Sequence, residues 1–248
     1  FDMIKNGKVI AGKSKIYGGY KGNETALQNY NRLKASPSLN LPNLNLLDGT
    51  RDFSGDWQRS LGWVNDGTYK GLTVKKKTEK FNGIFKSFTA SKDGAYTFSA
   101  YVKSSGNNAN IYRYVDIWDI NGKPKWTEHS NVLIGNNFDW LRDHYTLNLK
   151  TGDTLWSRYE ITGSGTDSVL WTAGHKWEEG STATPWMPSA NEVTTADISE
   201  YFGYDYIENQ AYTYYGETNI ERLSRWDIKD EIFSFMGVLY PQLPKTPT

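Results

Sequence analysis

From Leu46 to Pro188 the chain consists of short runs of alternating apolar and polar residues, and the runs are separated by turn signals. Successive side chains of a β-strand point to opposite faces, so this alternation is typical of strands with one buried face. The turn signals are clusters rich in Gly, Asn and Asp, which tolerate the backbone conformations of tight turns. They are Asn65-Asp66-Gly67, Lys92-Asp93-Gly94, Gly106-Asn107-Asn108, Asn121-Gly122 and Thr151-Gly152-Asp153. Repeated short strands at this spacing predict a mostly β chain folded as an antiparallel sandwich.

The segments on either side of this region differ from it in composition. Residues 1–44 are rich in Gly, Lys and Asn, and we interpret them as an N-terminal attachment arm or linker. A helix is expected there from Asn23 to Leu33, with Asn23 as its N-cap. After residue 190 the composition shifts to Asp, Glu and Tyr, and a second helical pattern runs from Thr218 to Phe235. The predicted division is an arm at 1–44, a β-sandwich at 45–190 and a partly helical C-terminal segment at 191–248.

Charge and cysteine content limit the classes of partner. The 248 residues include 28 basic and 28 acidic ones, so no net field favours nucleic acid or an anionic membrane. No apolar stretch approaches the roughly 18 residues that span a bilayer, and the first residues lack the apolar centre of a signal peptide. The absence of cysteine excludes disulfides, thiol nucleophiles and cysteine-ligated zinc. It is compatible with a protein made in a reducing cytoplasm and used outside it.

Aromatic residues are unusually frequent for so polar a chain. There are 10 Trp, 17 Tyr and 10 Phe, while the mean hydropathy is -0.66. Aromatic rings in a polar chain are either packed in the core or exposed as platforms for a ligand. Only their position along each strand distinguishes the two roles.

Two short motifs enclose the strand-patterned region. The first comprises Asn45 to Thr50, Phe53, Gly55 and Trp57, and the second comprises Lys176, Glu178, Gly180, Ala183 to Trp186 and Pro188. In this order and at this distance they resemble the motifs "NLL.GT..F.G.W" and "K.E.G..ATPW.P" of jelly-roll modules. Such carbohydrate-binding modules occur in tail, baseplate and receptor-binding proteins of bacteriophages of Gram-positive hosts. The resemblance does not extend into the C-terminal segment.

The resemblance implies a function, a location and partners. The module would adhere to a host cell-wall glycan without covalent chemistry. It would be made in the host cytoplasm and reside in the virion, with other phage tail or baseplate proteins as partners. No cofactor is expected, although modules of this kind often hold a structural calcium ion. No acidic cluster in the sequence has the spacing of an EF-hand, so no calcium ligands are predicted.

The sharpest prediction of a site comes from two strands. In Ile111 to Trp118, alternation separates an aliphatic face from one that carries three aromatic rings and a carboxylate. In Thr154 to Ile161 it likewise groups a ring with two charged residues. If both faces belong to one sheet, they form a shallow surface suited to a sugar, whose C–H face stacks on rings while its hydroxyls bind polar groups. The predicted carbohydrate-binding residues are Trp63, Tyr101, Tyr112, Tyr114, Asp116, Trp118, Trp156, Arg158 and Glu160.

Three alternatives to a sugar-binding surface stay open. The same rings could pack under a long loop or under the C-terminal segment. They could be buried against another virion subunit, in which case the protein is a structural hub. Catalysis has less support, because His129, His144 and His175 are scattered and neither a GxSxG motif nor a P-loop is present. A cell-wall glycosidase or depolymerase would need a carboxylate pair, for which Asp116 and Glu160 are the candidates.

Overall fold

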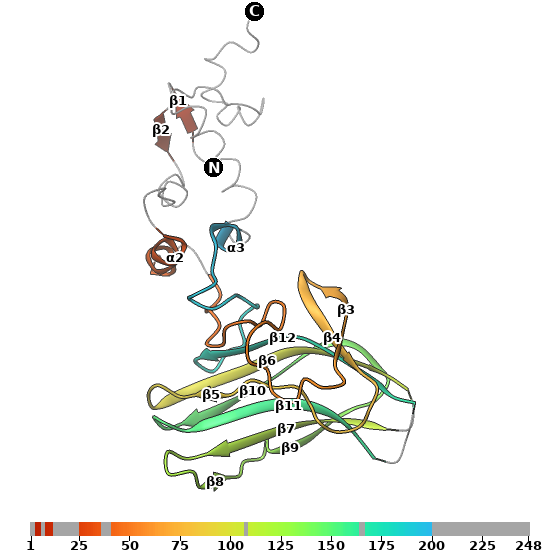
Figure 1. The fold of residues 1–248 in the computed structure, drawn as a ribbon. Helices are drawn as coiled ribbons and strands as arrows, with labels where there is room; N and C mark the ends of the chain where they lie inside the picture. The colour runs from red at the N-terminus through yellow and green to blue at the C-terminus, as the bar shows by residue number, and fades with distance from the viewer. Residues whose placement is uncertain are drawn as a thin grey trace, which may run out of the picture. The chain divides into compact units, whose positions relative to one another are not determined.

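The computed structural model describes residues 3–5, 8–11, 25–35, 41–106, 109–163 and 167–199. The chain divides into two compact units, of which one comprises Pro42–Glu192 and the other Phe1–Leu41 together with Val193–Thr248. The first unit is the β-sandwich of Figure 1. The predicted helix from Thr218 to Phe235 lies outside the described residues.

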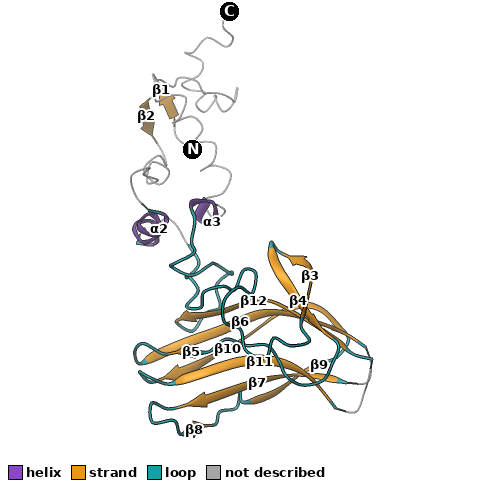
Figure 2. Ribbon diagram, in the orientation of Figure 1, coloured by secondary structure: helices purple, strands orange, loops and turns teal. Residues whose placement is uncertain are grey.

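The sandwich consists of two antiparallel sheets (Figure 2). The β6 sheet has the strand order β10 (Phe138–Leu149), β6 (Gly94–Ser105), β12 (Val169–Glu179), β4 (Leu72–Lys77) and β3 (Val64–Tyr69). The β7 sheet has the order β5 (Phe88–Thr89), β11 (Thr154–Thr162), β7 (Asn110–Trp118) and β8 (Pro124–Lys125), and β9 (Asn131–Gly135) also pairs with β7. The predicted fold class, a jelly-roll-like antiparallel sandwich, is confirmed.

The other unit contains the short elements β1 (Met3–Lys5), β2 (Lys8–Ala11), α2 (Ala26–Lys34) and α3 (Thr195–Ser199). Helix α2 forms where a helix was predicted, but its N-cap is Thr25 rather than Asn23. The reason is a capping box, in which the Gln28 amide donates to the Thr25 hydroxyl and the Thr25 amide donates to Gln28 Oε1. This reciprocal pair satisfies two backbone donors that the first turn leaves open.

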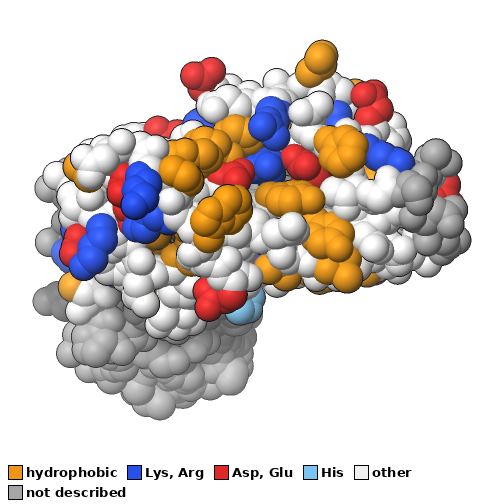
Figure 3. Space-filling model, turned by 90° about the horizontal axis from the view of Figure 1, so that it is seen from below, with side chains coloured by type: hydrophobic (Ala, Val, Ile, Leu, Met, Phe, Trp, Pro, Cys, Tyr) orange, Lys and Arg blue, Asp and Glu red, His pale blue; other side chains and the backbone are white. Residues whose placement is uncertain are grey.

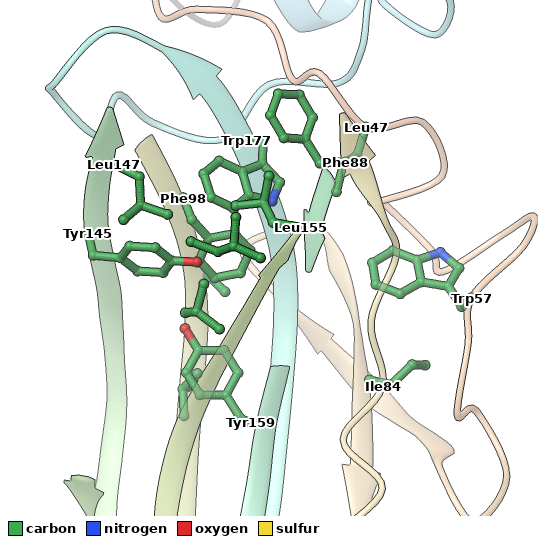
Figure 4. Packing of buried hydrophobic residues seen from close by; sticks show 14 of the residues in the cluster. Leu47, Trp57, Ile84, Phe88, Phe98, Tyr145, Leu147, Leu155, Tyr159 and Trp177 are labelled. Carbon is green, nitrogen blue, oxygen red and sulfur yellow. The ribbon is translucent and has the colours of Figure 1, made fainter. Parts of the chain in front are cut away.

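The core lies between the two sheets and is rich in aromatic rings (Figure 4). The inward residues of β6, Tyr96, Phe98, Ala100 and Val102, are all buried, as the alternation predicts. Trp177 on β12 is fully buried and stacks on Phe88, with ring centroids 5.1 Å apart. These residues come from both sheets, so burial of their apolar surface holds the sheets together.

One ion pair crosses the sandwich between the sheets. Arg113 of β7 points inward and is buried, and its Nη1 lies 2.8 Å and 2.7 Å from the two carboxylate oxygens of Asp143 on β10. The Tyr159 hydroxyl on β11 donates to the same carboxylate at 2.8 Å. Sequence reasoning assigned Arg113 to the inward face of its strand without naming its partner.

Asn45, the first residue of the N-terminal motif, is buried and uses the full hydrogen-bonding capacity of its side-chain amide. Its Nδ2 donates to Thr50 Oγ1 at 2.8 Å and to the carbonyl of His175 at 2.9 Å. Its Oδ1 accepts from the amides of Leu47 at 3.0 Å and Trp177 at 3.1 Å. The side chain thus connects the start of the sandwich to its last strand, so the first motif has a structural role.

The second motif contains a buried ion pair with its own hydrogen-bonding partners. Lys176 and Glu178 on β12 are fully buried, and their charged atoms lie 3.3 Å apart. Lys176 Nζ donates to Thr184 Oγ1 and to the carbonyl of Pro185, each at 2.8 Å. Glu178 accepts from the amide and hydroxyl of Thr184 and from Asn43. A buried pair is tolerated only when further hydrogen bonds satisfy both ions, and these residues supply them.

We predict that Asn45→Ala lowers the free energy of unfolding by about 2–4 kcal/mol, because it leaves several buried backbone groups without partners. Urea unfolding of the whole chain measures this loss. Asn65→Ala is the matched control, since Asn65 is exposed on β3, and it should change the free energy by less than about 0.5 kcal/mol. Equal effects of the two substitutions would contradict the role assigned to Asn45.

His175 is buried among aromatic rings. Its Nε2 lies 2.9 Å from the hydroxyl of Thr172, and its ring meets those of Trp57 and Phe98 edge to face. Burial lowers the pKa of His175 from 6.5 to about 3, because the surroundings disfavour the charged imidazolium. The imidazole is therefore a neutral part of the core.

This burial predicts a dependence of stability on pH. Below pH 6.5 the unfolded chain protonates His175 while the folded chain does not. The free energy of unfolding therefore decreases as the pH is lowered from 6.5 to about 3, and above pH 6.5 this group has no effect on it. The expected slope is about 1 kcal/mol per pH unit. Urea unfolding between pH 7 and pH 4 should give a shallower slope for His175→Gln than for the natural chain. Asn148→Gln, which alters an exposed side chain that does not titrate, is the matched control and should leave the slope unchanged.

Candidate functional site

The candidate site is the outward face of the β7 sheet. Strands β7 and β11 are antiparallel neighbours, so the condition set by the sequence, that both belong to one sheet, is met. Residues that face each other across an antiparallel pair have their side chains on the same side of the sheet. The facing pairs are Trp156 with Asp116, Arg158 with Tyr114, and Glu160 with Tyr112.

Three aromatic rings form a continuous stack at one end of this face. Trp118 of β7 stacks on Trp156 of β11, with centroids 4.3 Å apart and 26° between the ring planes. Phe85, from the segment before β5, stacks on Trp156 at 4.9 Å and 16°. Trp156 is therefore half-buried in the stack, whereas Trp118 lies at its end. Sequence reasoning missed Phe85, because it lies in a loop with no strand pattern.

Arg158 connects two carboxylates at the centre of the face. Its Nε donates to Glu160 Oε1 at 2.8 Å, its Nη1 donates to Asp116, and its guanidinium lies over the ring of Tyr114 at 5.2 Å. Burial alone would lower the pKa of Arg158, but the hydrogen bonds to Glu160 and Asp116 outweigh it and raise that pKa. The guanidinium is therefore charged, and it pairs with both carboxylates.

A loop covers the β11 side of the face. The amide of Gly83 donates to Glu160 Oε1 at 3.1 Å, and a Cβ placed on Gly83 would lie 2.4 Å from the carbonyl oxygen of Tyr159. Only glycine allows so close an approach. Arg158 and Glu160 are consequently 9% and 5% exposed, so the expectation that both are open to a ligand is wrong. Beneath the loop, Arg158 contacts Tyr114 and Asp116 and so holds these two residues of the face in place.

The open part of the face lies over β7 and the strands beside it. Tyr112, Tyr114, Asp116 and Trp118 are half-buried there, and Leu133 of β9, which faces Tyr112, is 51% exposed. Viewed from the side on which β7, β8 and β9 lie in Figure 1, hydrophobic side chains flank a row of basic and acidic ones (Figure 3). Aromatic rings and the carboxylate of Asp116 therefore lie side by side on this part of the face.

Trp126 is a further exposed ring that the site prediction omitted. It is 77% exposed and follows β8, in which Lys125 pairs with Ile117. Strand β8 ends at Lys125, so Trp126 lies in the loop between β8 and β9. Sequence reasoning missed it, because Trp126 lies outside the strands with clear alternation.

Two predicted residues lie elsewhere. Tyr101 belongs to β6 and faces outward from the opposite sheet, where Arg142 and Ala173 are its neighbours. Trp63 is 6% exposed and part of the core, and its indole N–H donates to the carbonyl of Asn82 at 3.0 Å. The predictions that they border the same surface are wrong, because alternation identifies a face of a strand but not the sheet to which the strand belongs.

No group of three or more His, Asp or Glu side chains in the described part of the chain is arranged to hold a metal ion. A structural calcium ion stays a prediction. Among the helices that the structure describes, none is long and apolar enough to cross a membrane.

We predict that Glu160→Gln destabilises the fold by about 2 kcal/mol, because the buried guanidinium of Arg158 then loses a charged partner. Glu179→Gln removes a carboxylate of the same type from an ion pair with Lys92 that is largely exposed. It should cost less than about 1 kcal/mol. Guanidinium chloride unfolding of both variants measures the difference, and a loss no larger for Glu160→Gln than for Glu179→Gln would refute the buried role of the carboxylate.

Comparison with known proteins identifies the class of the C-terminal segment. Residues 187–247 match the family model described as the C-terminal domain of Dit. This segment is therefore similar to part of a phage tail protein, and the predicted resemblance to a tail or baseplate protein of a Gram-positive phage is confirmed. The match falls on the segment to which the motif resemblance did not extend.

The particular relatives are distal tail proteins. A stretch of 49 residues is 84% identical to the distal tail protein of Lactococcus phage SK1, and a stretch of 63 residues is 59% identical to that of Lactococcus phage p2. These stretches cover 20% and 23% of this chain, and they span only 16% and 21% of the length of the two relatives.

Solved structures include similar folds at low identity. The CBM22-1 xylan-binding domain of Paenibacillus barcinonensis Xyn10C is 19% identical and covers 57% of this chain and 98% of that one, with a TM-score of 0.41. The tripod (BppUct-A-L) from the baseplate of bacteriophage Tuc2009 is 22% identical. The match covers 63% of this chain and 62% of that one, with a TM-score of 0.40.

Proposed function

We propose that the sandwich is a non-catalytic carbohydrate-binding module of a phage tail or baseplate protein, and that it adheres to the host cell-wall polysaccharide. The observation that carries this proposal is the outward face of the β7 sheet, on which the stacked Trp118 and Trp156 lie beside Asp116. We define the open part of it, Tyr112, Tyr114, Asp116, Trp118 and Trp126, as the β7 face.

The chemistry of the β7 face suits a sugar chain. A pyranose ring stacks its apolar C–H side on an aromatic ring, and each hydroxyl that loses water needs a hydrogen-bonding partner. Trp118 and the exposed Trp126 offer rings, and Asp116 offers acceptor oxygens. Arg158 and Arg59 balance the charges of Asp116 and Glu160, with Arg59 Nη1 at 3.5 Å from Glu160. A surface of balanced charge favours an uncharged glycan.

The two carboxylates are poorly placed for glycosidase chemistry. A glycosidase needs one carboxylic acid that gives its proton to the leaving oxygen and one free carboxylate. Asp116 and Glu160 both bind the same charged guanidinium, and Glu160 is covered by the loop at Gly83, so neither carboxylate is free to act on a substrate. This arrangement favours binding without bond cleavage.

The C-terminal segment would attach the module to the virion. Its similarity to the C-terminal domain of Dit supports assembly with other tail or baseplate proteins. Several copies on one particle would convert weak single sites into firm adhesion, with an overall affinity about 10² to 10⁴ times that of one site.

We predict that Trp118→Ala weakens binding to purified cell-wall polysaccharide of a lactococcal host about tenfold or more, since the loss of one stacked ring removes about 1.4 kcal/mol. Sedimentation of the fluorescently labelled chain with the polysaccharide measures the binding. Trp140→Ala is the control, because it removes a ring from the outer face of the opposite sheet. It should leave binding to the uncharged polysaccharide of the same host cell wall unchanged. Urea unfolding should show a loss of about 1 kcal/mol or less for Trp118→Ala.

The alternatives give different results in the same assay. Release of reducing ends would establish a glycosidase. The absence of saturable binding to any host polysaccharide would refute adhesion and favour a structural hub.

A further inference from the structure

We propose that the outer face of the β6 sheet is a second glycan-binding surface, specific for an anionic polysaccharide that carries carboxylate or phosphate groups. The proposal goes beyond the function proposed for the β7 face, since it concerns the other sheet and a different ligand class. We define the β6 face by its half-buried rings, which are Tyr69, Tyr101, Trp140, Trp171 and Trp186.

Strand register places these rings on the outside of the sandwich. Val102 of β6 is in the core, so its neighbours Tyr101 and Lys103 point outward. Tyr101 lies between Arg142 of β10 and Ala173 of β12, and Lys103 pairs with Trp171. These side chains therefore share the face that points away from the core.

The rings form a packed platform. Tyr69 stacks on Trp140 with centroids 4.3 Å apart and planes only 9° from parallel, and Tyr101 meets Tyr69 edge to face at 5.3 Å. They rest on Leu72, Val74 and Ala173, which form a small apolar cluster separate from the main core. The stacking holds the rings in place, so little side-chain freedom remains to be lost on binding.

Cations lie over the rings of this platform. Lys70 lies over Tyr69 at 5.5 Å, Lys103 over Trp171 at 5.7 Å, and Arg142 over Tyr101 at 5.7 Å. A ring attracts a cation to its face, so these contacts position positive charge at the height where a ligand stacked on neighbouring rings would lie.

The charges of the β6 face do not balance. Asp66 and Asp139 pair with Lys76 at 3.6 Å and Lys103 at 3.1 Å. Arg142 hydrogen-bonds the Ser99 hydroxyl and the carbonyls of Ala183 and Thr184, which are uncharged.

Lys70, which is exposed, forms no ion pair among the residues that the structure describes. The β6 face therefore has an excess of positive charge, in contrast to the β7 face.

Rings combined with excess cations match a sugar chain that carries anions. The rings stack on the sugar, while Lys70 and Arg142, which have no carboxylate partner among the described residues, attract its carboxylate or phosphate groups. A single-stranded nucleic acid also offers planar rings and phosphates. We favour the glycan because two cations of this face, Lys70 and Arg142, lack a carboxylate partner in the part of the chain that the structure describes. Two are fewer than line the continuous basic groove along which a single-stranded nucleic acid binds.

The test uses the full chain and polymers of defined charge. Isothermal titration compares polygalacturonate with its methyl ester, which has the same sugar without the charge, and dextran phosphate, a sugar chain that carries phosphate groups, provides the phosphate source. We expect binding to at least one of the two anionic polymers and none to the ester. Raising the salt concentration from about 0.05 M to about 0.5 M should weaken binding to the anionic polymer, because salt screens the attraction between exposed charges.

Variants locate the binding. The double variant Lys70→Gln with Lys103→Gln keeps the rings and should weaken anionic binding about tenfold, while Lys123→Gln, an exposed lysine beyond β7, is the matched control. Trp140→Ala should weaken anionic binding and spare binding to uncharged host glycan, whereas Trp118→Ala should do the reverse. The second comparison separates this proposal from the function of the β7 face.

Three results would overturn the proposal. They are the absence of binding to either anionic polymer, equal effects of the Lys123 control and the double variant, and tighter binding of an oligothymidylate than of both polymers. Loss of uncharged-glycan binding alone would refute only the function of the β7 face.

Discussion

The side chain of Asn45 controls the geometry of the last strand, on which both faces of the sandwich depend. Strand β12 contains a bulge between Ala173 and Lys176, with Gly174 at a φ of 59°. One extra residue on β12 reverses the alternation, because three steps from Ala173 to Lys176 oppose two steps on β6, so Trp171 faces outward before the bulge and Trp177 faces inward after it. The bulge removes backbone groups from the ladder, and Asn45 binds two of them, the carbonyl of His175 and the amide of Trp177. Asn45 therefore binds the strand at the point where its side chains change faces.

The outer surface of the β7 sheet depends on neutralised charge in the same way. Arg158 and Glu160 point away from the core, yet the loop at Gly83 buries them, which is tolerated because each ion has charged partners. Their mutual pairing fixes Arg158 against Tyr114 and next to Asp116. The exposed acceptor Asp116 is therefore held by a rigid layer beneath it, which reduces the entropy lost when a ligand binds.

Alternation along the strands predicted which side chains of β7 and β11 share a face, because a strand reverses its side chains at every residue. It could not predict the neighbours of each strand, which depend on contacts between residues far apart in sequence. Tyr101 illustrates this limit, since β6 pairs with β10 and β12 rather than with β7. Trp63 and Phe85 lie outside regular alternation, so their burial is decided by loops whose path is set by tertiary packing. The Asn45 hydrogen bonds were likewise invisible, although the motif that contains Asn45 marked the position.

The distribution of tryptophan gives the strongest argument for function. Trp57, Trp63 and Trp177 fill the core, whereas Trp118, Trp156, Trp140, Trp171 and Trp186 lie on outer faces of the two sheets. A sandwich needs large apolar rings only between its sheets, and rings on the outside favour association with other surfaces. Because the two outer faces point in opposite directions, one straight polymer cannot contact both. A module that uses both faces would therefore hold two glycan chains at once, and their different charge balance would let it distinguish between them.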